Sequence, residues 1–201
     1  PHISLENDTS IPPNFPIQES PCFEIQTLRL DPFIPLFQEI VDDLSTENTP
    51  LVPRCLGKEG IVIIMKKVQN RIIEKGYITT RVVVKPQDLT KGKLVLTLLL
   101  GHIQHITFAK ESSPRAFAYN ALALHEGDLL NLRSIEQGLE NFKRLPSVEA
   151  DFQILPSQQE GKSDLNILWK QPRMVRLSAT VDDAGTPSTG KYQGSTTLSL
   201  D

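Results

Sequence analysis

The sequence predicts an α+β protein in which the order strand, helix, helix, strand, strand occurs twice and two more strands follow. Three observations predict this class. Apolar residues at helical spacing alternate along the chain with segments in which apolar and polar residues take turns. The second such series restarts near residue 101. The last segment, 173–201, has a period of two on both sides of a loop rich in Gly, Pro and Thr.

We therefore expect a Pro-rich linker, two small domains and a terminal pair of strands. The boundaries are 1–21 for the linker, 22–100 and 101–171 for the domains, and 172–201 for the strands. The linker lacks periodicity, and its stretch TSIPPNFPIQESP contains four prolines, which favours an extended conformation over a packed element.

The first domain begins with a strand over 22–30. Asp31 is a candidate N-cap for a helix with Pro32 in its first turn, although Pro35 can shift the start by one turn. Apolar residues then keep helical spacing at Ile34, Phe37, Val41 and Leu44.

A second apolar stripe predicts the long helix: Ile61, Ile64, Met65, Val68 and Ile72. Gly76 ends this helix as a left-handed C-terminal cap. Two β-rich runs, 77–85 and 93–100, are joined by PQDLTKG and predict a hairpin.

The second domain repeats this order. We expect a strand over 102–110, helices over 113–124 and 131–145, and strands over 148–155 and 164–170. In each domain the two helices can cover only one face of a three-stranded sheet.

Composition and motifs argue against an enzyme or a nucleic-acid-binding protein. A net charge of −3 leaves no surplus of cations to neutralise phosphates. The Gly161–Ser163 sequence GKS lies in a hairpin and lacks the first glycine of a phosphate-binding loop. His102 and His105 point to opposite faces of a strand, so they cannot share a metal. We expect no catalytic residues, no cofactor and no metal.

Cys22 and Cys55 are the two cysteines of the chain. They are either buried free thiols or one disulfide, which would require an oxidising compartment such as the periplasm. A disulfide across this loop would stabilise the fold by roughly 3–4 kcal/mol.

Short motifs in a fixed order carry a family resemblance. They are PCFEI at 21–25, CLG at 55–57, KGYITTRV at 75–82, GHIQHITF at 101–108, NLRSIEQGLENFKRLP at 131–146 and VDDAG…TG at 181–190. Together they resemble polypeptide-transport-associated (POTRA) domains and, more closely, the two-partner-secretion outer-membrane transporters (TpsB family, type V secretion) in their haemolysin secretion/activation branch. Asp183 stands where that family would have Asn.

The resemblance implies two tandem β-α-α-β-β POTRA domains followed by the first β-hairpin of a truncated transmembrane β-barrel. The segments 173–182 and 191–201 fit the 9–11 residues that such strands need. An ordinary soluble hairpin that forms part of the second domain is the alternative. We expect Cys22–Cys55 to be a structural disulfide that ties the first strand to the start of the long helix.

The resemblance also implies a function. The chain would be the periplasmic part of a monomeric transporter in the outer membrane of a Gram-negative bacterium. It would recognise the amino-terminal secretion domain of an unfolded haemolysin- or adhesin-like exoprotein and pass it to the barrel pore. Whether transport is coupled to activation stays open. The alternatives are an assembly factor for outer-membrane proteins and a periplasmic scaffold that moves nothing.

An open sheet edge can accept an extended polypeptide as an added strand. In the resembled fold the first strand after the helices, here 78–85, lies at such an edge. Ile78, Thr80, Val82 and Val84 would face the helices. The candidate exoprotein-binding side chains on the outer face are Thr79, Arg81, Val83 and Lys85. Arg81 and Lys85 could instead protect the edge against aggregation. The matching edge of the second domain, 149–153, is acidic.

Overall fold

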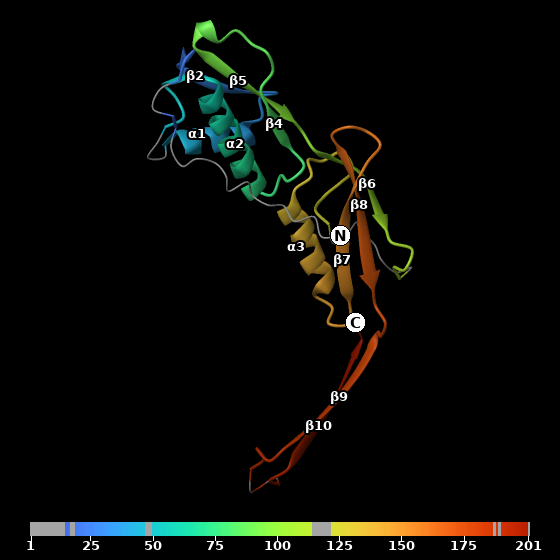
Figure 1. Ribbon diagram of the computed structural model, residues 1–201. Helices are drawn as coiled ribbons and strands as arrows, with labels where there is room; N and C mark the ends of the chain where they lie inside the picture. Colours follow the sequence, from blue (N-terminus) through green and yellow to red (C-terminus); the bar gives the residue numbers. More distant parts are fainter. Residues whose placement is uncertain are drawn as a thin grey trace. The chain divides into compact units, whose positions relative to one another are not determined.

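The computed structural model of the chain describes residues 15–16, 19–46, 50–113, 122–186, 188 and 190–200. Over these residues it contains two three-stranded and two two-stranded sheets (Figure 1). The chain divides into two compact units. The first reaches to Gln104 and also takes in Glu126–Arg133 and Pro156–Ser163, and the second consists of the remaining segments.

The main sheet of the first unit has the strand order β2-β5-β4. Its central strand β5 (Lys93–Leu99) is parallel to β2 (Thr27–Asp31) and antiparallel to β4 (Arg81–Val83). Buried and exposed residues alternate along β2, so one face of the sheet is apolar and the other is solvated. β2 and β4 are the two edges of this sheet.

Helices α1 (Pro35–Thr46) and α2 (Lys58–Glu74) cover the apolar face (Figure 1). α1 begins at Pro35 because the fixed φ of proline suits the first helical position, where no N–H is needed. Most of the expected stripe residues on both helices are buried in one core with the sheet, and Ile34, Ile61 and Met65 are half-buried against it. Its residues from the two helices and the main sheet are Leu28, Leu30, Phe37, Ile40, Val41, Leu44, Ile63, Ile64, Val68, Ile72, Val82, Leu94, Leu96 and Leu98. Among the described residues, no helix combines the length and the apolar character needed to cross a membrane.

The segment expected as one strand over 22–30 is two strands. β1 (Phe23–Ile25) pairs with β3 (Arg54–Leu56), a strand that the sequence did not reveal, and β2 starts after Gln26. The N–H groups of Gln26 and Thr27 both donate to the Gly92 carbonyl, at 2.8 and 3.1 Å. The chain leaves its pairing with β3 at this point and pairs with β5 from Thr27 on. The alternation of apolar and polar residues could not show this change, because it reports which face of a strand is buried and not which strand lies beside it.

A Schellman motif ends α2, which confirms the expected glycine cap. Gly76 has a φ of 98°, its N–H donates to Ile73 O at 2.8 Å, and the Tyr77 N–H donates to Ile72 O at 3.1 Å. Glycine is favoured at such a position because it has no Cβ to clash in the left-handed region.

The second main sheet has the order β6-β8-β7. Hydrogen bonds from His102 N–H to Gly161 O and from Ala109 N–H to Ile167 O advance in the same direction along both segments, so β6 and β8 run parallel. The three strands confirm the expected ones: β6 (His102–Phe108), β7 (Glu149–Pro156) and β8 (Lys162–Lys170).

One of the two helices expected in the second domain is confirmed as α3 (Leu132–Lys143). Its Phe142 is buried and meets the ring of Phe108 on β6 edge to face, with centroids 6.4 Å apart. Residues 114–121 of the other expected helix lie outside the described residues. Its last residues, 122–124, are not helical, although Leu122 and Leu124 are buried.

The terminal strands β9 (Val175–Asp182) and β10 (Gln193–Leu200) form an antiparallel sheet of their own. Their register runs from Val175 opposite Leu200 to Asp182 opposite Gln193, which places the apolar positions of both strands on one face. This face is exposed: Val181 and Leu200 are 80% and 76% accessible. The alternative of a soluble hairpin required these strands to form part of the second domain. They do not pair with its main sheet, and their apolar face is exposed.

Candidate polypeptide-binding edge

Strand β4 lies at the edge of its sheet, and no other strand of the described chain lies on its outer side. The turn that ends α2 also delays β4, since Ile78 N–H donates to Gly76 O at 3.0 Å and Thr80 N–H to Tyr77 O at 3.3 Å. The backbone stays turned until Arg81. The strand expected over 78–85 was therefore too long, because the turn overrides the β-propensity of the Ile and Thr residues.

Where β4 is regular, its side chains alternate as expected. Thr80 and Val82 are buried towards the helices, whereas Arg81 is exposed and Val83 is half-buried on the outer face. Lys85 is exposed two residues beyond the strand end. Two exposed cations thus lie along this edge, Arg81 at the start of β4 and Lys85 just beyond its end.

Thr79 does not belong to the outer face with them. It lies in the turn before β4, half-buried, and its hydroxyl is enclosed without a hydrogen-bond partner among the described residues. A Cβ on Gly101 would overlap this hydroxyl. Thr79 therefore packs inside the first unit, which corrects the expected placement.

Two of the backbone groups that point outward at β4 are already bonded. In an antiparallel pair, alternate residues turn their N–H and C=O away from the partner strand. The carbonyl of Thr80, the residue just before β4, and the N–H of Val82 do so, and both meet the side chain of Gln69 on α2. Gln69 Nε2 donates to Thr80 O at 2.9 Å, and Gln69 Oε1 accepts from Val82 N–H at 2.7 Å.

Sequence reasoning missed Gln69. It follows Val68 of the apolar stripe directly and is half-buried, so hydrophobic periodicity passes over it. The only available signal was a neutral side chain carrying both a donor and an acceptor beside a buried helix face.

A second glutamine completes the same sheet further along. Gln87, in the loop before β5, donates from Nε2 to Val95 O at 2.9 Å and accepts at Oε1 from Val95 N–H at 2.8 Å. It bonds β5 where β4 has already ended, so the inner ladder is continued by a side chain.

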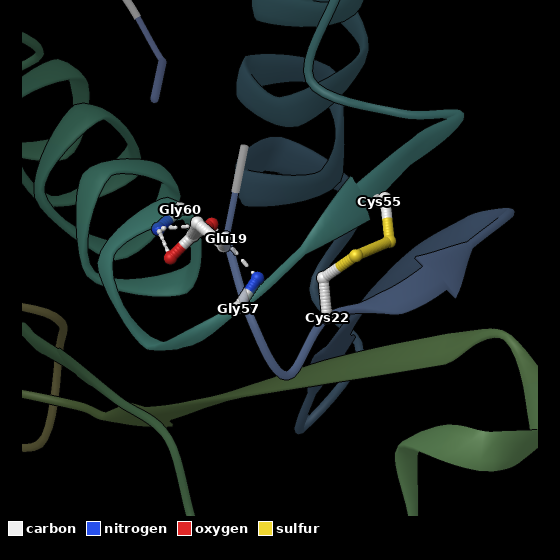
Figure 2. Close-up of a disulfide and its surroundings, with 5 residues drawn as sticks. All are labelled: Glu19, Cys22, Cys55, Gly57 and Gly60. Atoms are coloured by element: carbon white, nitrogen blue, oxygen red, sulfur yellow. Dashed lines mark hydrogen bonds between the residues drawn. A yellow bond between two sulfur atoms is a disulfide. The ribbon is translucent and has the colours of Figure 1, made fainter. Parts of the chain in front are cut away.

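The first unit is clamped near the other end of α2, where Cys22 and Cys55 form the expected disulfide with a Cα–Cα distance of 5.5 Å. Figure 2 shows Glu19 beside this bridge, at the start of α2. Its carboxylate accepts from the N–H groups of Gly57 and Glu59, each at 2.8 Å, and of Gly60 at 3.1 Å. Because Gly57 offers no side-chain cap, Glu19 supplies one from the linker.

Phe15 anchors the linker as well. It is buried and belongs to the core of the first unit. The guanidinium carbon of Arg54 lies 3.9 Å from its ring centroid, and Lys67 Nζ lies 5.1 Å from it. The described part of the Pro-rich segment is thus packed against the first unit, although the sequence predicted a linker and not a packed element.

The corresponding edge of the second main sheet is β7, which is acidic as expected. Glu149, Asp151 and Gln153 are exposed along it. The Phe152 N–H donates to the Asp151 side chain at 2.9 Å. The charge of this edge is opposite to that beside β4, so the two edges favour different partners.

The described residues contain no group of His, Cys, Asp and Glu side chains suited to a metal ion. One carboxyl has a displaced pKa: hydrogen bonds from the Thr90 hydroxyl and N–H lower the pKa of Asp88, which caps the short 3-10 helix η1 (Leu89–Lys91). This is a local structural effect, away from β4.

Comparison with known families decides the identity. Residues 23–101 match the POTRA domain, ShlB-type, residues 102–156 match the POTRA domain, and residues 161–201 match the haemolysin secretion/activation protein ShlB/FhaC/HecB. The outer membrane transporter CdiB-2 of Burkholderia pseudomallei is 34% identical over 98% of this chain. The chain belongs to the two-partner-secretion outer-membrane transporters.

Other members of this transporter family agree with the match. The outer membrane transporter CdiB of Dickeya dadantii is 34% identical over 91% of the chain. The solved structure of CdiB from Acinetobacter baumannii is 28% identical, and it superposes on 92% of this chain and 36% of its own with a TM-score of 0.77. The chain spans about a third of the two curated relatives, 36% and 32% of their lengths.

The fold is therefore that of tandem POTRA domains followed by the first strands of the transporter barrel. Transporters of this family are proteins of the Gram-negative outer membrane, with their POTRA domains in the periplasm. An oxidised disulfide in the first POTRA domain is consistent with that compartment.

Proposed function

We propose that the chain is the periplasmic part of a transporter that binds an unfolded secreted exoprotein as an added strand on β4 and passes it to the barrel pore. The observation that carries the proposal is the position of β4 at a sheet edge: within the described residues no strand pairs with its outer side, where the Gln69 side chain of α2 bonds the backbone. Main-chain hydrogen bonds at such an edge are indifferent to client sequence, which suits a polypeptide that must move on.

The exposed cations beside β4 have two compatible roles here. Arg81 and Lys85 attract acidic and polar client segments, and they repel the β4 edge of a second copy. We expect the client to be an exoprotein engaged through its amino-terminal secretion domain, and we expect the transporter to act on it as a monomer.

Charge reversal tests the edge. Arg81→Glu combined with Lys85→Glu should weaken binding of the amino-terminal secretion domain, with a lower association rate and a smaller salt dependence. Arg29→Glu is the matched control, because Arg29 is exposed on β2, the opposite edge of the same sheet. Equal affinities for all three proteins would contradict the choice of β4.

Cross-linking tests contact directly. The two native cysteines are joined to each other, so a cysteine introduced as Lys85→Cys is the only free thiol in the chain. It should form a disulfide with cysteines placed along the client segment, whereas Arg29→Cys should not. Capture of unfolded outer-membrane barrels in place of exoproteins would indicate an assembly factor, and capture of neither would indicate a scaffold.

A further inference from the structure

The side chain of Gln69 takes the place of a peptide group on the outer side of β4. Its carboxamide presents one donor and one acceptor, and these bond Thr80 O and Val82 N–H at 2.9 and 2.7 Å. These two outward hydrogen bonds are therefore made within the molecule, at the position where an added strand would make them.

The bonding pattern defines which strand the carboxamide imitates. In a parallel pair, one residue donates to the carbonyl before its opposite residue and accepts from the N–H after it. Gln69 does so around Arg81. Gln87 instead bonds both groups of the single residue Val95, which is the antiparallel pattern and matches the direction of β4.

We propose that Gln69 is a displaceable latch on this edge, an inference that rests on the proposed function. A client strand enters parallel to β4, displaces the carboxamide, and takes over Thr80 O and Val82 N–H through the residue opposite Arg81. Until then the latch keeps these groups paired and denies the edge to other strands.

The exchange is feasible because it conserves hydrogen bonds. The client replaces both bonds, and the released carboxamide bonds to water. Gln69 is half-buried and unbranched, so it can rotate outward while α2 stays in place. The latch competes with the client through two bonds, which corresponds to about a tenfold lower affinity for the client.

The test uses the full chain and a defined probe. The probe is an acetylated nine-residue peptide of alternating Thr and Val with a terminal Lys, labelled for fluorescence anisotropy. Gln69→Met keeps the length of the side chain and removes both hydrogen-bonding groups, so it should bind the probe about tenfold more tightly than the wild type. Gln38→Met is the matched control, because the Gln38 side chain donates to Asp42 Oδ1 on the same helix, α1. It should bind like the wild type.

A second peptide and a second variant make the result specific. The same peptide with N-methyl groups on the alternate residues that would face β4 lacks the N–H groups that bond this edge. It should not bind Gln69→Met more tightly than the wild type. Gln69→Glu keeps an acceptor for Val82 N–H but repels Thr80 O, so its affinity should lie between those of the wild type and Gln69→Met. In the absence of peptide, the Val82 amide should exchange with solvent faster in Gln69→Met than in Gln38→Met.

The outcomes distinguish a failure of the latch proposal from a failure of the proposal that the client binds at β4. Equal affinity of wild type and Gln69→Met, with the Lys85→Cys cross-link to the client intact, would overturn the latch and leave the β4 edge as the binding surface. If neither protein binds the probe and the cross-link is absent, both proposals fall.

Discussion

Replacing Gly60 with alanine should destabilise the first POTRA domain. Within a helix this substitution usually stabilises by about 0.5–1 kcal/mol, since glycine loses more conformational freedom on folding. Here a Cβ on Gly60 would lie 2.7 Å from Glu19 Oε2 and 2.8 Å from Leu56 Cδ2. Leu56 can shift its side-chain end, but Glu19 cannot move without losing its hydrogen bonds to the start of α2.

The magnitude follows from those bonds. Loss of an N-cap costs about 0.5–2 kcal/mol, and a hydrogen bond to a charged group contributes about 1.5–3 kcal/mol. Displacement of Glu19 should therefore cost about 2 kcal/mol, which outweighs the propensity gain and leaves Gly60→Ala less stable by about 1 kcal/mol. Glu19→Ala alone should cost about 2 kcal/mol. Once Glu19 is gone, adding Gly60→Ala should have no cost or should stabilise the domain.

Native-state hydrogen exchange at Ile64 and Val68, two buried residues of α2, measures this stability in the intact chain. The four proteins form a double-mutant cycle, and the expected coupling energy between Glu19 and Gly60 is about 1–2 kcal/mol. Effects that add within about 0.5 kcal/mol would refute the idea that the linker carboxylate caps α2.

Three further predictions concern other features of the same domain. Gly76→Ala should lower the free energy of unfolding by about 2 kcal/mol in thermal denaturation, because Gly76 has a φ of 98° and a Cβ there would lie 2.6 Å from Asn131 Oδ1. Reduction of the disulfide, whose cysteines are 33 residues apart, should lower the free energy of unfolding by roughly 3–4 kcal/mol. Urea unfolding with and without a reductant measures this difference. Hydrogen bonds from Thr90 lower the pKa of Asp88 below 3.8, so their contribution is present above about pH 4 and is lost as the pH falls through the lowered pKa. An NMR titration of the Thr90 amide should show this loss, and Asp88→Asn should abolish it.

The sequence could predict the features that repeat along the chain. The apolar stripes of α1 and α2, the alternation in β7 and β8, and the Gly76 cap each arise from local rules that a periodic pattern records. The terminal hairpin was predictable for the same reason, because both faces of each strand are visible in the period of two.

Features that depend on a distant partner were not predictable. The split between β1 and β2 arises because Gly92 accepts two hydrogen bonds, from Gln26 and from Thr27. Glu19 and Gln69 bond backbone groups that lie 38 and 11 or more residues away, and no spacing rule links them. The length of β4 was overestimated because the β-propensity of its residues competes with a turn whose geometry is set by the preceding helix.

Gln69 and Gln87 both bond backbone groups of the first sheet through their carboxamides, but they should differ in how easily these hydrogen bonds are broken. Gln87 belongs to the loop that connects β4 to β5, so its backbone is fixed beside Val95 by the hairpin itself. Gln69 projects from α2, and its carboxamide is held at β4 by its two hydrogen bonds and not by the path of the backbone around it. A charged side chain in its place would also keep other strands away. It could bond only one of the two outward groups, because a carboxylate only accepts and an ammonium only donates. A neutral carboxamide on a flexible stem satisfies the edge while it is empty and can be exchanged for a peptide group at little net cost, which is what an edge that binds many successive segments of one client requires.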